Sequence, residues 1–325
     1  MEDQFEAPQI TDEINPKKEG YRSRSPWITV LFLLAIILVW FVVLGPLIGF
    51  LIAIPFIEGS ILDFAQHVSN PTDHPEIKTP LFIIQGCATF FGLAFGPALY
   101  WWSSEKRNPF DFFKKKHIPP VMIFVTIVIV VGFMATNSVF IDWNANVKFP
   151  DFLRGFEQWA KQTEAHAAEL TAFLTTFNSP GEFVFTFFII AILAGFSEEL
   201  VFRGMIQPEL KKATHNIHAA IWISAFLFSA LHMQFFGFVP RVLLGALFGY
   251  LYYWSGNLLI SMFAHMVNNG FSVLIIYLHQ LGKIEMDVET TEAAPWPAVI
   301  FSAVLTGGLL YYFYTYYHTR KTSIA

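Results

Sequence analysis

The feature that most constrains this chain is a series of long stretches without charge. A helix needs roughly 20 apolar residues to cross about 30 Å of hydrocarbon. Eight stretches approach or exceed that length: Pro26 to Ile57, Pro80 to Ser104, Pro119 to Ile141, Phe183 to Phe202, Ile217 to Phe236, Val242 to Ser255, Leu258 to Leu281 and Trp296 to Tyr317. Because these runs are continuous and do not alternate with period 2, helices are favoured over a β-barrel. We predict an all-α integral membrane protein with about eight transmembrane helices.

The composition agrees with a lipid environment. Of 325 residues, 54% are hydrophobic and 14% are charged, and 37 are Phe. A soluble domain has about 25% charged residues, whereas aromatic side chains suit membrane interfaces. This balance excludes a disordered chain and a nucleic-acid partner, and it makes the lipid bilayer the surroundings of the protein. A single cysteine, Cys87, excludes an intrachain disulfide.

The basic residues indicate an orientation. If the N-terminus is cytoplasmic, the inside segments contain 14 of the 20 Lys and Arg, and cytoplasmic loops are the ones that accumulate these residues. The 14 are Lys17, Lys18, Arg22, Arg24, Lys106, Arg107, Lys114, Lys115, Lys116, Arg203, Lys211, Lys212, Arg320 and Lys321. We therefore expect both termini in the cytoplasm and an even number of spans, in a bacterial inner (plasma) membrane.

The chain divides into four predicted regions. Residues 1–25 form a polar cytoplasmic tail, and residues 26–180 hold the first three spans. Residues 181–281 form a core of four spans, and residues 282–325 hold a loop, the last span and a short cytoplasmic tail. Within the second region, Asp151 to Phe177 places apolar residues at three- and four-residue spacing between charged ones, which predicts an amphipathic helix on the outer surface.

Ionisable groups inside the apolar spans are the candidate functional residues, because each costs roughly 2.5 to 3.5 kcal/mol at the centre of a membrane helix. The fourth span contains Glu198, Glu199 and, at its end, Arg203. The fifth contains Phe228 followed by His232, and the seventh contains His265 followed by Asn268 and Asn269. The other eight His residues fall in loops or near span ends, where solvation accounts for them. These are His67, His74, His117, His166, His215, His218, His279 and His318.

Helical spacing suggests different roles for the two glutamates. Residues four apart share a helix face, so Glu199 and Arg203 can form an ion pair, while Glu198 points about 100° away and is free to act as a general base. The same spacing lets His265 and Asn269 donate hydrogen bonds toward one point. His232 could accept a proton, orient a water or bind a metal. Both features also have a purely structural alternative. The Glu199–Arg203 pair could only stabilise the end of the helix, and the His and Asn side chains could only make polar contacts between helices.

Three short patterns in this order resemble a known family. Glu198-Glu199 with Arg203, Phe228 with His232, and His265 with Asn269 are similar to the EExxxR, FxxxH and HxxxN motifs of the CPBP family, also called the ABI family. That family includes the type II CaaX prenyl endopeptidases and bacterial self-immunity proteins. The resemblance covers roughly Phe183 to Phe271, and the residues before it resemble the family only in being helical spans.

The resemblance implies helices that enclose a catalytic cavity, and intramembrane endopeptidase activity on a membrane-associated protein or peptide. Glu198 would activate water with help from His232, and His265 and Asn269 would stabilise the oxyanion. Glu199 and Arg203 would be essential support, and Phe228 would pack beside the site. The sequence specifies neither the substrate nor the oligomeric state.

Two questions stay open at the level of sequence. Glu198, His232 and His265 could bind Zn²⁺, but there is no HExxH motif and the two His lie on different helices, so we favour a metal-free glutamate mechanism. The alternatives to a protease are a non-catalytic immunity or scaffold protein of the same family and a proton-coupled carrier. Against the carrier, the candidate groups gather at one site and form no chain across the bilayer.

Overall fold

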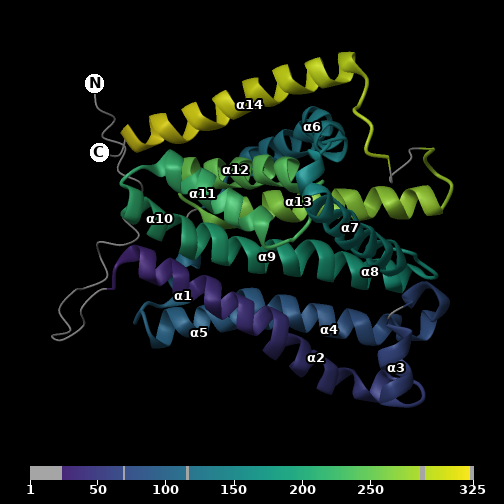
Figure 1. Cartoon of the computed structure of the whole chain (residues 1–325). Coiled ribbons are helices and arrows are strands. Elements are labelled where there is room, and N and C mark those ends of the chain that lie inside the picture. Colours follow the sequence, from purple (N-terminus) through teal and green to yellow (C-terminus); the bar gives the residue numbers. More distant parts are fainter. Residues whose placement is uncertain (1–23, 69, 115–116, 286–289, 323–325) are drawn as a thin grey trace.

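The computed structural model describes residues 24–68, 70–114, 117–285 and 290–322, and the regular secondary structure of this part of the chain is entirely helical, without a strand (Figure 1). Most of the predicted tail, residues 1–23, lies outside the described residues, as do Lys115 and Lys116. The α-helices are α1 (Pro26–Val39), α2 (Gly45–Ala53), α3 (Ile61–His67), α4 (Lys78–Phe90), α5 (Gly96–Ser103), α6 (Pro120–Ala145), α7 (Arg154–Leu174), α8 (Pro180–Phe187), α9 (Ala194–Glu199), α10 (Gln207–Thr214), α11 (Ile217–Ala230), α12 (Phe238–Ser255), α13 (Leu258–Gln280) and α14 (Trp296–Thr322).

Wider and tighter helical turns join several of these helices into longer ones. The π-helical turns are η1 (Trp40–Leu44), η5 (Phe91–Phe95), η8 (Phe188–Leu193) and η9 (Leu200–Ile206). The 3₁₀ turns are η2 (Ile54–Phe56), η3 (Pro71–Asp73), η4 (Pro75–Ile77), η6 (Pro109–Phe113) and η7 (Asp151–Leu153). Because π turns continue the helix, α8, η8, α9, η9 and α10 form one helical rod from Pro180 to Thr214.

Six helices in the described part of the chain are long and apolar enough to cross a membrane, which agrees with an all-α membrane protein. They are Pro26–Phe56, Pro75–Ser103, Pro120–Ala145, Pro180–Thr214, Leu258–Gln280 and Trp296–Thr319. The predicted count of about eight is not confirmed. The apolar helix α11 has only 14 residues, and α12 is not among the six.

The structure also corrects the boundaries of the fifth and sixth predicted spans. The apolar run from Ile217 to Phe236 is one predicted helix, yet α11 ends at Ala230 and a turn comes next. The next helix begins at Phe238, earlier than the predicted Val242, so Arg241 lies inside α12. His232 therefore lies in a turn between two helices and not within a span.

The helices pack in layers around α13. In Figure 1, α1, α2, α4 and α5 form a layer on one side, and α6 and α14 lie on the other. Between them, α13 contacts α9, η8, α12 and α6. The start of α1 and the end of α14 lie at the same end of the molecule (Figure 1), as expected for an even number of spans.

A glycine allows the 180–214 rod to approach α13 closely. A Cβ atom on Gly195 would lie 2.9 Å from Cγ and 3.0 Å from the backbone N of Met266. Real Cβ atoms hardly ever make contacts this short, so a larger residue would push the two helices apart. Since Gly195 precedes the two glutamates by one turn and Met266 comes directly after His265, this contact sets the distance between the two polar motifs.

The segment predicted as an amphipathic helix is helical. After η7, α7 runs from Arg154 to Leu174, and it buries Ala160, Phe173 and Leu174. Its location on the outer side of the membrane stays a prediction. In the structure, α7 also contacts the turn between α11 and α12 through Glu164, whose Oε2 accepts a hydrogen bond from Phe236 N at 2.8 Å.

Candidate active site

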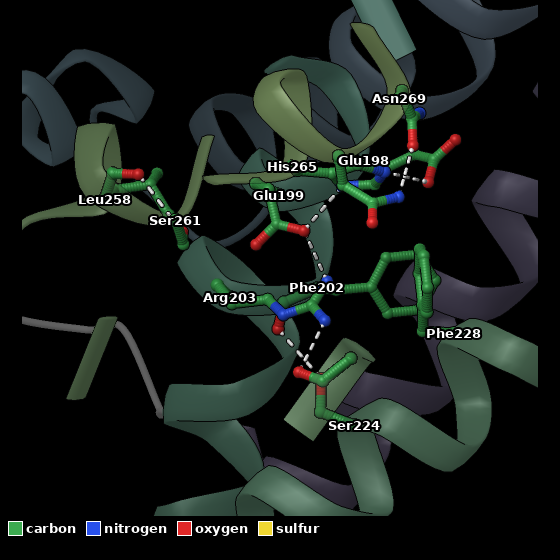
Figure 2. A network of polar contacts seen from close by, with 12 residues as sticks. Glu198, Glu199, Phe202, Arg203, Ser224, Phe228, Leu258, Ser261, His265 and Asn269 are labelled. Atoms are coloured by element: carbon green, nitrogen blue, oxygen red, sulfur yellow. Dashed lines mark hydrogen bonds and ion pairs between the residues drawn. The ribbon is translucent and has the colours of Figure 1, made fainter. Parts of the chain in front are cut away.

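A buried ion pair forms the base of the site, as the spacing predicts. The side chains of Glu199 and Arg203 are 0% exposed, and Arg203 Nη1 donates to Glu199 Oε1 at 2.7 Å (Figure 2). Arg203 Nη2 donates to the carbonyl of Gly245 at 2.7 Å. The guanidinium also lies 4.9 Å from the ring centre of Phe228. A buried charge is tolerated only when it is paired and hydrogen-bonded, and these contacts meet part of that need. Arg203 Nε and Glu199 Oε2 are buried and have no hydrogen-bond partner among the described residues.

His265 connects this ion pair to the second glutamate. Its Nδ1 lies 2.9 Å from Glu199 Oε1, and its Nε2 lies 3.8 Å from Glu198 Oε2 (Figure 2). A carboxylate oxygen can only accept a hydrogen bond. The Nδ1 atom of His265 therefore carries a proton and donates a hydrogen bond to Glu199 Oε1. This bond fixes the orientation of the ring and directs Nε2 toward Glu198, as a carboxylate does for the catalytic histidine of serine proteases.

Glu198 is the less constrained of the two acids. Its side chain is 14% exposed, whereas that of Glu199 is fully buried. The Oε2 atoms of both acids are buried and have no hydrogen-bond partner among the described residues, but Glu199 also has an Oε1 that binds Arg203 and His265. A buried carboxylate oxygen of this kind needs a water or a ligand group as its partner. The division predicted from the sequence, with Glu199 paired and Glu198 available, agrees with this geometry.

Asn269 lies one helical turn after His265, and its side chain is already hydrogen-bonded to a neighbouring helix. Its Nδ2 donates to the carbonyl of Ile190 at 3.0 Å, and its Oδ1 accepts from Asn268 Nδ2 at 3.1 Å. Ile190 is in the π turn η8. Figure 2 shows the Asn269 side chain on the same side of the cluster as Glu198. An amide carries two N–H bonds, so one donor of Asn269 remains for another partner.

His232 lies beside the cluster and is not hydrogen-bonded to it. It is an exposed residue, and its Nδ1 donates to the carbonyl of Phe228 at 2.8 Å. The Phe228 ring contacts both imidazoles, with ring centres 4.9 Å from His232 and 5.8 Å from His265. Thus Phe228 separates the two histidines. The bond to the carbonyl leaves Nε2 of His232 as its free ring nitrogen.

The turn that carries His232 is held by residues that the sequence did not single out. Met233 has a φ of 55°, an unusual value for a residue with a side chain. Besides Glu164 of α7, Asn144 of α6 binds the backbone here, with Oδ1 accepting from Val239 N at 2.7 Å and Nδ2 donating to Phe235 O at 3.1 Å. A polar residue at the end of an apolar helix was the only available signal for Asn144.

Arg241 is a second residue that the sequence analysis missed. Its Nη2 donates to Gln234 Oε1 at 2.6 Å, while its Nη1 is buried and has no hydrogen-bond partner among the described residues. Arg241 lies in the first turn of α12, which directly follows the turn that carries His232. Its guanidinium adds positive charge to this side of the site. The sequence signal was a lone Arg at the edge of an apolar run, a position typical of a loop.

The candidate metal ligands do not converge. Tetrahedral zinc places its ligand atoms about 3.4 Å apart, from bond lengths of about 2.0–2.1 Å. Glu198, His232 and His265 do not form a group with ligand atoms within 4.8 Å of one another in the described part of the chain. The Nδ1 atoms of both histidines are bonded to other groups, so Nε2 is the nitrogen of each ring that remains for a metal. These residues as placed do not fit a three-ligand zinc centre, so we derive no step through a metal.

Comparison with known proteins finds a family model that covers this cluster. Residues 180–271 match the model described as type II CAAX prenyl endopeptidase Rce1-like. We call this stretch the Rce1-like domain after the model that it matches. It contains all six predicted site residues, from Glu198 to Asn269.

Other comparisons cover less of the chain. An 82-residue segment is 30% identical to "Uncharacterized protein YpbD" of Bacillus subtilis (strain 168), which corresponds to 24% of this chain and 39% of that protein. The match therefore spans less than half the length of this relative. No solved structure matches the chain.

Proposed function

We propose that this protein is an intramembrane endopeptidase that hydrolyses peptide bonds of a membrane-associated protein or peptide. The observation that carries the proposal is the contact of Glu198 with His265 on top of a fully buried Glu199–Arg203 pair. This arrangement lies in the Rce1-like domain, between two helices that are long and apolar enough to span a membrane. An ionisable cluster in such a position is a functional site by default.

The first step is the activation of water by Glu198. Its free carboxylate oxygen takes a proton from the water, and the water oxygen bonds to the carbonyl carbon of the substrate. His232, on the adjacent turn, assists by orienting the water or the proton. The C–N bond of the tetrahedral intermediate then breaks, and the proton on Glu198 passes to the leaving amine.

The second requirement is stabilisation of the negative charge on the carbonyl oxygen. We assign this to His265 Nε2 and to the second N–H of Asn269, which lie on neighbouring turns of α13. For Nε2 to donate, His265 must carry a proton on both nitrogens. In that form, the side chains of Glu198, Glu199, Arg203 and His265 sum to zero net charge, which suits a buried cluster.

The test is a comparison of membranes that contain the native protein or the Glu198→Gln variant. Gln has nearly the same shape as Glu but cannot take a proton, so cleavage should fall by about 10² to 10⁴-fold while the protein still folds. Mass spectrometry of newly formed peptide termini in membrane proteins measures cleavage and identifies the substrate. Glu169→Gln, an exposed change on α7, is the matched control and should cleave like the native protein.

Two outcomes would contradict the proposal. If native and Glu198→Gln membranes give the same set of termini and the same phenotype, the protein acts as a scaffold or immunity partner. If Glu198→Gln abolishes ion-dependent uptake in vesicles and leaves all termini unchanged, the protein is a carrier.

A further inference from the structure

Outside the Rce1-like domain, three potential metal ligands meet in the connection between α3 and α4. His67 is the last residue of α3, His74 separates the 3₁₀ turns η3 and η4, and Glu76 lies within η4. The Nδ1 atoms of His67 and His74 lie 3.2 Å and 3.1 Å from the same oxygen, Glu76 Oε1. The three ligand atoms all lie within 4.8 Å of one another. We propose that these side chains bind one divalent transition-metal ion of the zinc class.

The distances suit a shared ion. With bond lengths of about 2.0–2.2 Å and tetrahedral angles, the ligand atoms around zinc are about 3.4 Å apart. The two measured N···O separations need to widen by only a few tenths of an ångström to reach this value. Without an ion, His74 Nδ1 donates a hydrogen bond to Glu76 Oε1, and His67 Nδ1 lies at ion-pair distance from the same oxygen. With an ion, each ring carries its proton on Nε2 and the lone pair on Nδ1 becomes the ligand.

The orientation of the two rings predicts a movement on binding. The rings of His67 and His74 are stacked, with centres 3.5 Å apart and planes 5° apart. A nitrogen lone pair lies in the plane of its ring, so one ion cannot lie in the planes of two parallel rings. The rings must therefore turn apart when the ion binds. Their side chains are 30% and 32% exposed, which leaves room for this rotation.

The donor set selects the class of ion. Two imidazoles and one carboxylate favour Zn²⁺ and similar ions, whereas Ca²⁺ and Mg²⁺ prefer oxygen ligands. The partial exposure of all three side chains leaves a fourth position for water. Asp63, one turn before His67, adds negative charge nearby but is not a free ligand, because its Oδ2 accepts hydrogen bonds from Ser60 Oγ at 2.7 Å and Ser60 N at 3.1 Å.

Such a site would fix the entrance to a membrane span. His67 ends one helix, and Glu76 lies in the first turn of the candidate span Pro75–Ser103. An ion bound by both residues joins the two elements across the eight residues between them, which include two prolines, Pro71 and Pro75. The expected consequence is a more rigid connection and no direct effect on the Glu198 cluster.

The experiment is a titration of the purified full-length protein in detergent, stripped of metal with a chelator. Zn²⁺ is followed by calorimetry, and Co²⁺ by its visible absorption, which reports the geometry of its ligands. The native protein should bind one equivalent at this site. Glu76→Gln keeps an acceptor for both imidazoles but removes the anionic ligand, so affinity should fall by at least about tenfold. His74→Ala should remove this equivalent, and the exposed His166→Ala variant should retain it.

A second readout is independent of stoichiometry. Hydrogen exchange of the backbone between residues 57 and 77 should slow when Zn²⁺ is added to the native protein and should not change in Glu76→Gln. The proposal is overturned if the native protein binds no Zn²⁺, or if Glu76→Gln and His74→Ala bind it as the native protein does. Because Glu76→Gln keeps the loop contacts, it tests the site even if His74→Ala fails to fold.

Discussion

The two halves of the candidate active site differ in how they are held. Glu199, Arg203 and His265 come from two long helices, are buried, and bind one another directly. His232 comes from an exposed turn that is fixed by backbone contacts to Asn144 and Glu164. The first half depends on a buried ion pair, so loss of either partner leaves a buried charge without its counter-charge. The second half depends on hydrogen bonds from remote side chains to backbone groups.

Removal of Arg203 should have the largest effect. Arg203→Ala leaves the carboxylate of Glu199 buried without its cation, and loss of one partner of a buried ion pair costs about 3–5 kcal/mol. We expect the variant to be largely unfolded or degraded, as measured by SDS-induced unfolding of the purified protein. The control is Arg154→Ala, which removes an exposed ion pair with Asp151 and should leave the midpoint unchanged. If Arg203→Ala unfolds at the same SDS content as the native protein, the base of the site is not rigid.

The two histidines should respond differently. His265→Gln removes a buried hydrogen bond to Glu199 and should reduce both stability, by about 1–3 kcal/mol, and cleavage, by about 10² to 10⁴-fold. His232→Gln should reduce cleavage in the same range, but its exposed position predicts a stability change within about 0.5 kcal/mol. Parallel unfolding and cleavage assays measure both quantities. Equal destabilisation by the two changes would contradict the distinction between the halves.

The smallest effect is expected at Glu164, which contacts the turn and not the cluster. Glu164→Ala leaves Phe236 N without its acceptor, so His232 should be less well positioned and kcat should fall by about tenfold with KM little changed. Glu164→Gln restores an acceptor oxygen and should recover most of kcat. The matched control is Glu169→Ala, an exposed change on the same helix. A loss of kcat in Glu169→Ala as large as that in Glu164→Ala would mean that α7 acts only through general packing.

The sequence predicted the local part of this site and not the contacts between helices. The Glu199–Arg203 pair is expected from four-residue spacing, and the structure confirms it. The bond between His265 and Glu199 joins positions 66 residues apart, so no helical period contains it. It depends on the close approach at Gly195, which is a property of two packed surfaces. The roles of the individual site residues in catalysis stay predictions.

The same reasoning explains the error in the fifth predicted span. No Gly or Pro interrupts the run from Ile217 to Phe236, so hydropathy predicts one helix. The break occurs because Asn144 and Glu164, far away in the sequence, bind the backbone groups of Phe235, Phe236 and Val239. Local sequence shows whether a helix can form, but these remote acceptors and donors make the turn favourable. The count of about eight spans also rests on hydropathy, and it is not confirmed.

The π turns have a consequence for how the glutamate motif is constructed. In the rod from Pro180 to Thr214, η8 precedes α9 and η9 succeeds it, so the two acids lie between segments in which each turn holds more residues than in an α-helix. Deletion of one residue between Glu199 and Arg203 would keep every chemical group of the motif but would rotate Arg203 around the helix axis by roughly a quarter of a turn, somewhat less than the 100° per residue of an α-helix. The direction in which Arg203 points relative to Glu199 therefore depends on the number of residues between them as well as on the identities of the motif side chains.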